Sequence, residues 1–197
     1  MANQILERRL VAGELLRDRG DLLVVAGLGA PSWDCTAVGD HPLTFPLWGA
    51  MGGACMIGLG LALAQPKKNV LVITGDGEML MGLGSLGTLA VQRPANLSVV
   101  VLDNERYGET GMQKTHTAHG VDLAKVALAC GFKMAATVTS MVELAAARKI
   151  IYEGKRGPVL YQVKVGNEKL SLVLPPRDGP HLKNRFRQAL LGESAFA

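Results

Sequence analysis

The chain alternates short, wholly apolar runs with longer segments in which apolar residues recur at helical spacing. The apolar runs predict strands over residues 22–26, 70–74, 97–102, 133–138 and 158–165. The segments around them predict helices over 3–19, 52–64, 84–92, 121–130 and 140–152, and a last basic helix before residue 191. Apolar strands that alternate with helices are typical of a parallel sheet covered on both faces. We therefore expect an α/β protein, with a three-layer, doubly wound, mainly parallel sheet.

The same pattern bears on the domain organisation. No repeat period interrupts the alternation, so we expect one domain over residues 1–174 and a tail over 175–197 that contains a short basic helix. Residues 43–65 carry no charge, a length that would suffice for a membrane span. Because this stretch contains Pro46 and five glycines, a loop followed by a buried helix is the better interpretation.

Composition adds three points. Glycine occupies 24 of 197 positions, about twice the usual ~7%, which favours backbone brought close to a ligand. The net charge of +4 is mild and favours anionic ligands without demanding nucleic acid. Cys35, Cys55 and Cys130 are too few and too widely spaced for a disulfide framework or a zinc site. With no signal-peptide pattern at the N-terminus, we expect a reduced, cytoplasmic protein.

Polar residues follow two of the predicted strands where each strand ends. Gly75, Asp76 and Gly77 follow strand 70–74, and Asp103 and Asn104 follow strand 97–102. The 26 residues between Gly77 and Asn104 suffice for one helix and its loops, so the two strands are neighbours or have one strand between them. A carboxylate and an amide oxygen at one sheet edge suit Mg²⁺, which takes further ligands from backbone, water or phosphate. From spacing alone, an ordinary turn and a loop-capping asparagine are the alternative.

These residues resemble the thiamine diphosphate-binding motif, although Asp103 stands where its first closing asparagine usually lies. Residues 48–52 resemble the loop that holds the cofactor's aminopyrimidine in 2-oxo acid decarboxylases and acetolactate synthases. Residues 104–108 are similar to the metal and diphosphate loop. Segments 76–82, 102–104 and 108–113, with parts of the tail, resemble the sulfopyruvate and phosphonopyruvate decarboxylases. The likeness covers most of residues 20–190.

The resemblance implies specific roles for the residues of this motif. Asp76 and Asn104 would bind Mg²⁺ through side-chain oxygens, and Arg106 through its backbone carbonyl. The residues that would surround the diphosphate are Gly75, Gly77, Glu78, Tyr107 and Gly108. For Glu78 only the backbone N–H is implied, because a glutamate side chain would repel phosphate unless it were turned away.

The resemblance also implies catalytic roles. Gly49 would accept a hydrogen bond from the cofactor's 4′-amino group through its carbonyl, and Met51 would hold the cofactor bent. The alternative for Met51 is an ordinary core methionine. His116 would lie at the active-site mouth, where it meets an anionic substrate or relays protons. Surface or partner-facing positions are the alternative for His116 and His119.

In this family the glutamate that activates the aminopyrimidine comes from a second αβ domain, and we find no matching position here. The resemblance therefore implies a hetero-oligomer with a pyrimidine-binding subunit of similar size. The reaction implied is the conversion of a small anionic 2-oxo acid to an aldehyde and CO₂, with carboligation left open.

Two further interpretations are weighed against this one. Gly82, Gly84 and Gly87 form a GxGxxG pattern followed by Asp103 about 20 residues later, as in NAD(P)-binding Rossmann oxidoreductases. That fingerprint should follow a strand directly, whereas these glycines begin seven residues beyond Gly75. The other alternative is a non-catalytic cofactor-binding subunit.

Overall fold

A single parallel sheet organises the computed structural model, which describes residues 5–196. Its six strands are ordered β2-β1-β3-β4-β8-β7, and every neighbouring pair is parallel. The strands are β1 (Leu23–Ala26), β2 (Thr44–Pro46), β3 (Val70–Gly75), β4 (Leu97–Asp103), β7 (Met134–Val138) and β8 (Val159–Lys164). The predicted fold class is confirmed, and β3 and β4 are direct neighbours.

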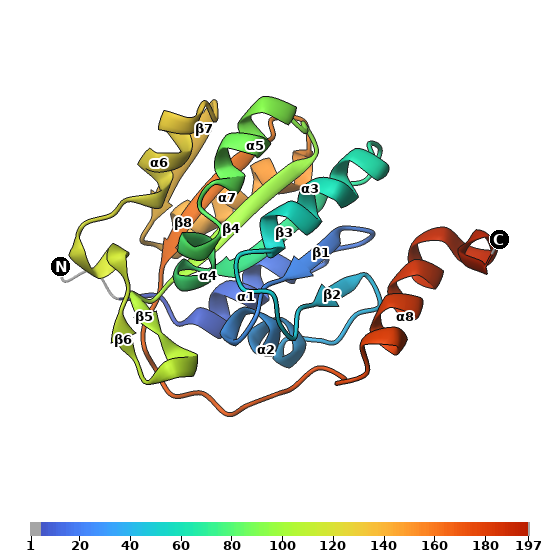
Figure 1. Ribbon diagram of the computed structural model, residues 1–197, viewed down its shortest axis with the longest axis horizontal. Coiled ribbons are helices and arrows are strands. Elements are labelled where there is room, and N and C mark those ends of the chain that lie inside the picture. Colours follow the sequence, from blue (N-terminus) through green and yellow to red (C-terminus); the bar gives the residue numbers. More distant parts are fainter. Residues whose placement is uncertain (1–4, 197) are drawn as a thin grey trace.

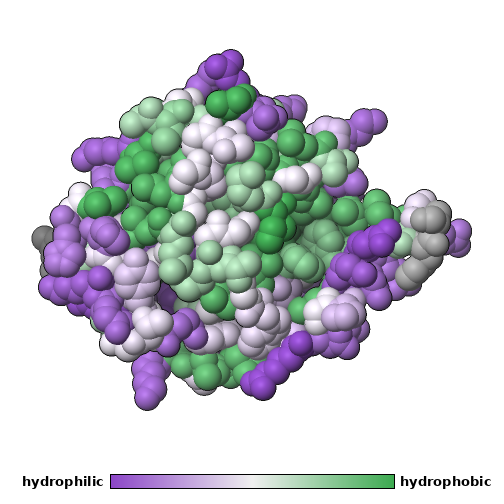
Figure 2. All heavy atoms as spheres, viewed as in Figure 1, coloured by the Kyte–Doolittle hydropathy of each residue, from purple (hydrophilic) through white to green (hydrophobic). Residues whose placement is uncertain are grey.

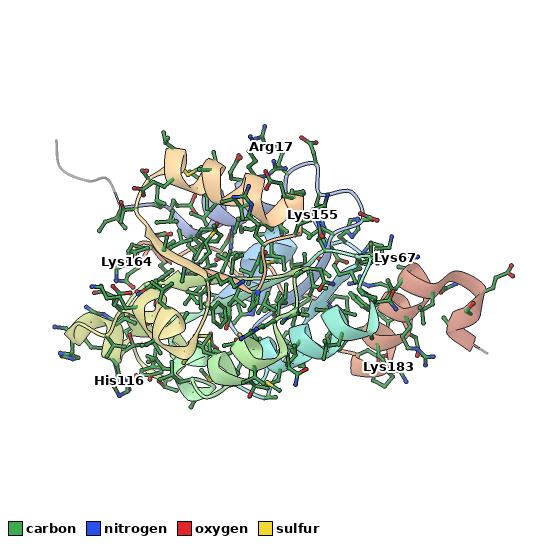
Figure 3. The ribbon with its side chains drawn as sticks, turned by 90° about the horizontal axis from the view of Figure 1, so that it is seen from above. Arg17, Lys67, His116, Lys155, Lys164 and Lys183 are labelled. Carbon is green, nitrogen blue, oxygen red and sulfur yellow. The ribbon has the colours of Figure 1, made fainter. Side chains whose placement is uncertain are left out.

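Helices cover both faces of the sheet and make three layers (Figures 1 and 3). One face carries α3 (Ala54–Ala64), α4 (Asp76–Met81), α5 (Ser85–Gln92) and α6 (Leu123–Cys130). The other carries α1 (Arg8–Leu16), α2 (Ala30–Ala37) and α7 (Met141–Glu153). Alternate strand residues enter the two cores: Val70 and Val72 face the first, Leu71 and Ile73 the second. The strands read as continuous apolar runs because both of their faces are buried.

The chain leaves β1 and β3 toward opposite faces of the sheet. After β1 it enters α2 on one face, whereas after β3 it enters α4 on the other. The carboxyl ends of these neighbouring strands therefore border a crevice, which is where α/β sheets usually bind ligands.

Several short elements differ from the sequence-based expectation. The sequence predicts a loop over residues 27–31, but α2 begins there, after Gly29 at φ 80°. The short edge strand β2 and the six-residue helix α4 are also absent from that expectation. Beyond β4 the chain forms a hairpin of β5 (Arg106–Tyr107) and β6 (Gln113–Lys114), with the 3-10 helices η1 (Gly108–Thr110) and η2 (His116–His119). The first helix covers residues 8–16, and positions 3–4 of its predicted range lie outside the described residues.

Residues beyond β8 return across the molecule. Residues 166–178, here called the strap, form no helix or strand and lead to α8 (Gly179–Leu191) and η3 (Gly192–Phe196), as Figure 1 shows. On α8, Phe186 packs edge-on against Phe45 of β2, with ring centroids 5.8 Å apart. The division into a domain over 1–174 and a tail stays a prediction. Over residues 5–196, no helix has the length and apolar character needed to cross a membrane.

Candidate cofactor-binding site

A cavity of about 770 Å³ opens at the carboxyl edge of the sheet, where the loops after β1, β3 and β4 meet. It therefore lies at the crevice where the chain reverses direction across the sheet. The predicted site residues in its lining are Met51, Gly75, Asp76, Gly77, Glu78, Asn104, Arg106, Tyr107 and Gly108. The structure thus brings together residues from three loops that are far apart in the sequence.

Asp76 is the first residue of α4 and is only 2% exposed. Its Oδ2 accepts a hydrogen bond from Oγ1 of Thr115 at 2.6 Å, and Oγ1 of Thr117 lies 3.3 Å from the same oxygen. Burial raises the pKa of this carboxyl to about 6, and the charge of Asp103 adds to the increase. Both hydroxyls lie against the same oxygen, which leaves Oδ1 for a cation. A buried carboxylate with one oxygen free is a suitable ligand for a hard divalent ion.

Asn104 begins the loop that follows β4. Its Oδ1 accepts a hydrogen bond from the Arg106 backbone N–H at 3.0 Å, and Glu105 between them has φ 61°. This side chain-to-backbone turn reverses the chain into the β5–β6 hairpin. An amide oxygen has two lone pairs, so this bond leaves one for a metal.

Gly77 allows the loops after β3 and β4 to approach one another. A Cβ at this position would lie 2.7 Å from two ring carbons of Tyr107, closer than such atoms can pack. The sequence suggested that this glycine exposes backbone to phosphate. The structure adds that any side chain here would displace Tyr107 from the cavity wall.

Glu78 is 3% exposed, and its carboxylate lies beside the ends of β1 and β3. Its Oε2 accepts a hydrogen bond from Thr74 Oγ1 at 2.8 Å and lies against Gly27 at the end of β1. Burial raises the pKa of this carboxyl. The Glu78 side chain is thus turned away, as the resemblance requires, and the contact of its backbone N–H with a phosphate stays a prediction.

The loop before α3 contacts the end of α4 backbone to backbone. A Cβ at Gly82 would lie 2.2 Å from the carbonyl oxygen of Gly52, whose own φ is 91°. Met51 is half-buried and lines the cavity, whereas Gly49 is exposed and lies outside its lining. This backbone contact with Gly52 accounts for a glycine at position 82 without a bound dinucleotide. Gly82, Gly84 and Gly87 follow α4 rather than a strand, so the Rossmann fingerprint lacks its structural context.

The histidine-containing segment contributes threonines to the site. Thr115 and Thr117 are buried against Asp76, while His116 and His119 are exposed, and His116 lies at the outer edge of the molecule in Figure 3. Neither histidine lines the cavity, and the catalytic role of His116 stays a prediction. Sequence reasoning missed both threonines. It also missed the cavity walls formed by Leu28, Ala30 and Pro31 and by residues 167–172 of the strap.

The amino-acid sequence matches a known family of cofactor-binding domains. The model of the thiamine pyrophosphate enzyme C-terminal TPP binding domain matches residues 32–163. The chain therefore belongs to the thiamine pyrophosphate enzymes and carries their TPP-binding domain. Within that family it is 38% identical, over 169 residues, to sulfopyruvate decarboxylase subunit beta of Methanocaldococcus jannaschii. The match covers 85% of this chain and 88% of that subunit.

Longer relatives contain the same domain. Phosphonopyruvate decarboxylase of Streptomyces viridochromogenes is 38% identical over 180 residues, which cover 91% of this chain and 44% of that enzyme. A thiamin diphosphate-dependent enzyme from Mycobacterium smegmatis shares the fold, with a TM-score of 0.70 and 24% identity. The chain covers 32% of that structure's length. The predicted family, that of the thiamine diphosphate-dependent decarboxylases, is confirmed.

Proposed function

We propose that this chain is the thiamine diphosphate- and Mg²⁺-binding subunit of a heteromeric decarboxylase. Its substrate would be a small anionic 2-oxo acid of the sulfopyruvate or phosphonopyruvate type, converted to an aldehyde and CO₂. The observation that supports this most strongly is that Asp76, Asn104 and Arg106 line the same cavity, at the crevice beside the carboxyl ends of β1 and β3. The names of the relatives support the reaction class.

The residues of this cavity fit a magnesium ion. Asp76 would bind it through the free Oδ1, Asn104 through its amide oxygen, and Arg106 through its backbone carbonyl. A cation is favoured because the Asp76 carboxylate is buried, whereas the neighbouring Asp103 already pairs with Lys164. Phosphate and water would supply its further oxygen ligands, which Mg²⁺ prefers.

The cofactor would span the cavity from the diphosphate loop to the loop before α3. Gly75, Gly77 and Glu78 would offer backbone N–H groups at the start of α4, where the unpaired amides favour an anion. Tyr107 and Gly108 would close the other side. Met51 would support the cofactor, and the Gly49 carbonyl would orient its amino group. When bound, thiamine diphosphate supplies the electron sink for the loss of CO₂.

A partner chain would cover the exposed side of this loop and supply the activating glutamate. Trp48 is 39% exposed, and the charge-free helix α3 exposes Met56, Ile57 and Leu63. Figure 2 shows hydrophobic and near-neutral residues over the middle of the face that carries α3 and α5. Such a surface is typical of a protein–protein interface. The name "subunit beta" of the M. jannaschii relative supports a second subunit.

Basic residues in the cavity support an anionic substrate. Arg8, Arg9 and Lys169 all line it. Both arginines pair with the fully buried Asp34. The lining also holds acidic side chains, so a sulfonate or phosphonate would pair with individual basic groups there and not with a net positive charge.

The metal assignment is tested by replacing its carboxylate. Asp76→Ala should abolish Mg²⁺-dependent binding of thiamine diphosphate, followed as quenching of Trp33 and Trp48 fluorescence. Asp21→Ala is the matched control, because it removes an exposed carboxylate that pairs with Lys68. The control should bind as the wild type does. Unchanged cofactor affinity in Asp76→Ala would overturn the assignment. A screen of 2-oxo acids with the co-purified partner then identifies the substrate.

A further inference from the structure

A buried polar network extends from the candidate metal ligand to the far side of β4. Asp103, the last residue of β4, is 1% exposed, although the cofactor motif usually has an uncharged asparagine at this position. Lys164 is its register partner on the neighbouring strand β8. The proposed cofactor chemistry uses neither residue, so a buried charge at this position requires its own explanation.

Asp103 accepts four hydrogen bonds. Its Oδ2 receives Gln162 Nε2 at 2.6 Å and Lys164 Nζ at 2.8 Å. Its Oδ1 receives Thr117 Oγ1 at 2.7 Å and the Glu105 backbone N–H at 3.1 Å. Lys164 also binds Glu105 Oε1 at 2.6 Å. The carboxylate is therefore fixed in one orientation and paired with a lysine that it shares with Glu105.

Thr117 connects this ion pair to Asp76. Its hydroxyl lies 2.7 Å from Asp103 Oδ1, 3.3 Å from Asp76 Oδ2 and 2.8 Å from the hydroxyl of Thr115. Thr115 in turn donates to Asp76 Oδ2 at 2.6 Å. Both threonines are buried, so water cannot replace these contacts without a cost in free energy. The orientation of Asp76 is thus set by hydroxyls that the Asp103–Lys164 pair holds in place.

We propose that Thr115 is a positioning residue whose hydroxyl holds Oδ2 of Asp76 so that Oδ1 faces the magnesium ion, and that Thr117, in contact with this hydroxyl, keeps it in place. The buried Asp103–Lys164 ion pair fixes Thr117 in turn. Lys164 is the counter-charge that lets an aspartate replace the usual asparagine. This inference rests on the proposed function, because it assigns a purpose to residues behind the same metal site. It adds four residues that the proposed metal and cofactor contacts do not include.

The threonine step is tested by direct metal binding. Thr115→Val removes the hydroxyl at nearly constant volume, whereas Thr115→Ser keeps it. Mn²⁺ replaces Mg²⁺ in the full chain co-purified with its partner and saturated with thiamine diphosphate, and electron paramagnetic resonance counts the free ion. Thr115→Val should weaken Mn²⁺ binding about tenfold or more, the value of one hydrogen bond to a charged group, and Thr115→Ser by less than about threefold. Thr139→Val, which removes a hydroxyl bound to Glu143 at the start of α7, should bind normally.

The possible outcomes distinguish a failure of the positioning role from a failure of the proposed function. If the wild-type protein binds neither Mn²⁺ nor cofactor, the proposed function is wrong. If it binds both and Thr115→Val binds Mn²⁺ equally well, only the positioning role is wrong. A lower melting temperature without a change in Mn²⁺ affinity would also overturn the positioning role, because it would show a purely structural one.

The counter-charge is tested by a double-mutant cycle. Lys164→Met alone leaves Asp103 buried without its cation, so the melting temperature should fall by about 5 °C or more. Adding Asp103→Asn should restore most of the loss, because the position then carries the motif's usual neutral amide. Asp103→Asn alone should be mild, since Lys164 keeps Glu105 as a partner. If Lys164→Met destabilises equally with aspartate or asparagine at position 103, the compensation is contradicted.

Discussion

Single glycines in this protein bring together segments that a side chain would hold apart. Gly77 lies against the Tyr107 ring, and Gly82 lies against the carbonyl of Gly52. Each contact joins two loops of the candidate site. Glycine content alone suggested close backbone approach, but it could not indicate which glycines approach a ligand and which approach the protein itself.

Replacing Gly77 should therefore affect cofactor binding. In Gly77→Ala the new methyl group must push Tyr107 aside, which we expect to destabilise the fold by about 1–3 kcal/mol and to weaken thiamine diphosphate binding. Gly87→Ala is the control, because a Cβ at this position inside α5 would have no atom within 4 Å. It should stabilise the protein by about 0.5–1 kcal/mol. Thermal unfolding and fluorescence titration measure both effects, and equal behaviour of the two variants would contradict the crowding at Gly77.

The three thiols should differ sharply in reactivity. Burial raises the pKa of both Cys35 and Cys55 to about 12, so at pH 8 almost none of either is thiolate. Cys130 is exposed at the end of α6. Brief treatment of the native chain with iodoacetamide should label Cys130 alone, and unfolding should release the other two. Mass spectrometry of peptides reads the result, and rapid labelling of either buried thiol would contradict their burial.

The functional residues could be predicted where they directly follow the end of a strand. Asp76 and Asn104 both line one cavity because parallel strands deliver their carboxyl ends to one edge. Thr115 and Thr117 were not predictable. Thr115 meets Asp76 across 39 positions, through a hairpin that no local pattern in the sequence indicates. His116, which lies between the two threonines, was the predicted site residue, but the structure buries the threonines and exposes the histidine.

At the scale of elements, burial on both faces decided what could be predicted. Long apolar strands and helices were predicted at nearly their observed positions, since two-sided burial imposes a continuous pattern. The six residues of α4 and three of β2 are too few to show a period, and α2 begins within a Gly-Ala-Pro sequence that is typical of a loop. Tertiary packing and helix ends stabilise such elements more than intrinsic propensity does. Sequence patterns over a few residues therefore fail to predict the elements nearest the site.

Two glycines on α3 allow a matched test of helix packing. Gly58 faces the sheet, where a Cβ would lie 2.3 Å from Val72 Cγ2, while a Cβ at Gly60 would have no atom within 4 Å. Gly58→Ala should destabilise the protein by about 1–3 kcal/mol, because α3 must move away from β3. Gly60→Ala should stabilise it by about 0.5–1 kcal/mol. Urea unfolding at equal protein concentration gives both values, and a similar loss in both variants would contradict this packing.

For the whole molecule, the C-terminal strap and α8 do more than extend the domain. The strap is fixed at both ends: Gly166 N–H donates to Leu6 O at 2.9 Å, and Trp48 Nε1 donates to Pro176 O at 2.7 Å. Between these points it forms a wall of the cavity. The sequence predicted a basic helix in the tail, but not its contact with β2. That contact depends on Phe45 and Phe186, which lie far apart in sequence and in segments without a shared pattern.

Undocking α8 should expose the strap. Phe186 is 8% exposed and packs against Phe45, so Phe186→Ala removes the main apolar contact between α8 and β2. Loss of a buried phenylalanine costs about 3–5 kcal/mol, but local release of α8 limits the effect on global stability. Limited proteolysis should cut within 166–178 at least about tenfold faster than in the wild type. Arg187→Ala, at the next and exposed position, should be cut at the wild-type rate. Equal cleavage of both variants would contradict the docking.

The ion pair between Asp103 and Lys164 also has a consequence for the history of this sequence. The two residues are 61 positions apart, yet adjacent strands place them side by side. Aspartate at the first position without the lysine would leave a buried charge unpaired, whereas the lysine beside an asparagine would still pair with Glu105. The lysine is therefore expected to arise before the aspartate or together with it. Relatives with the acidic form of the motif should accordingly carry a cation at the end of β8.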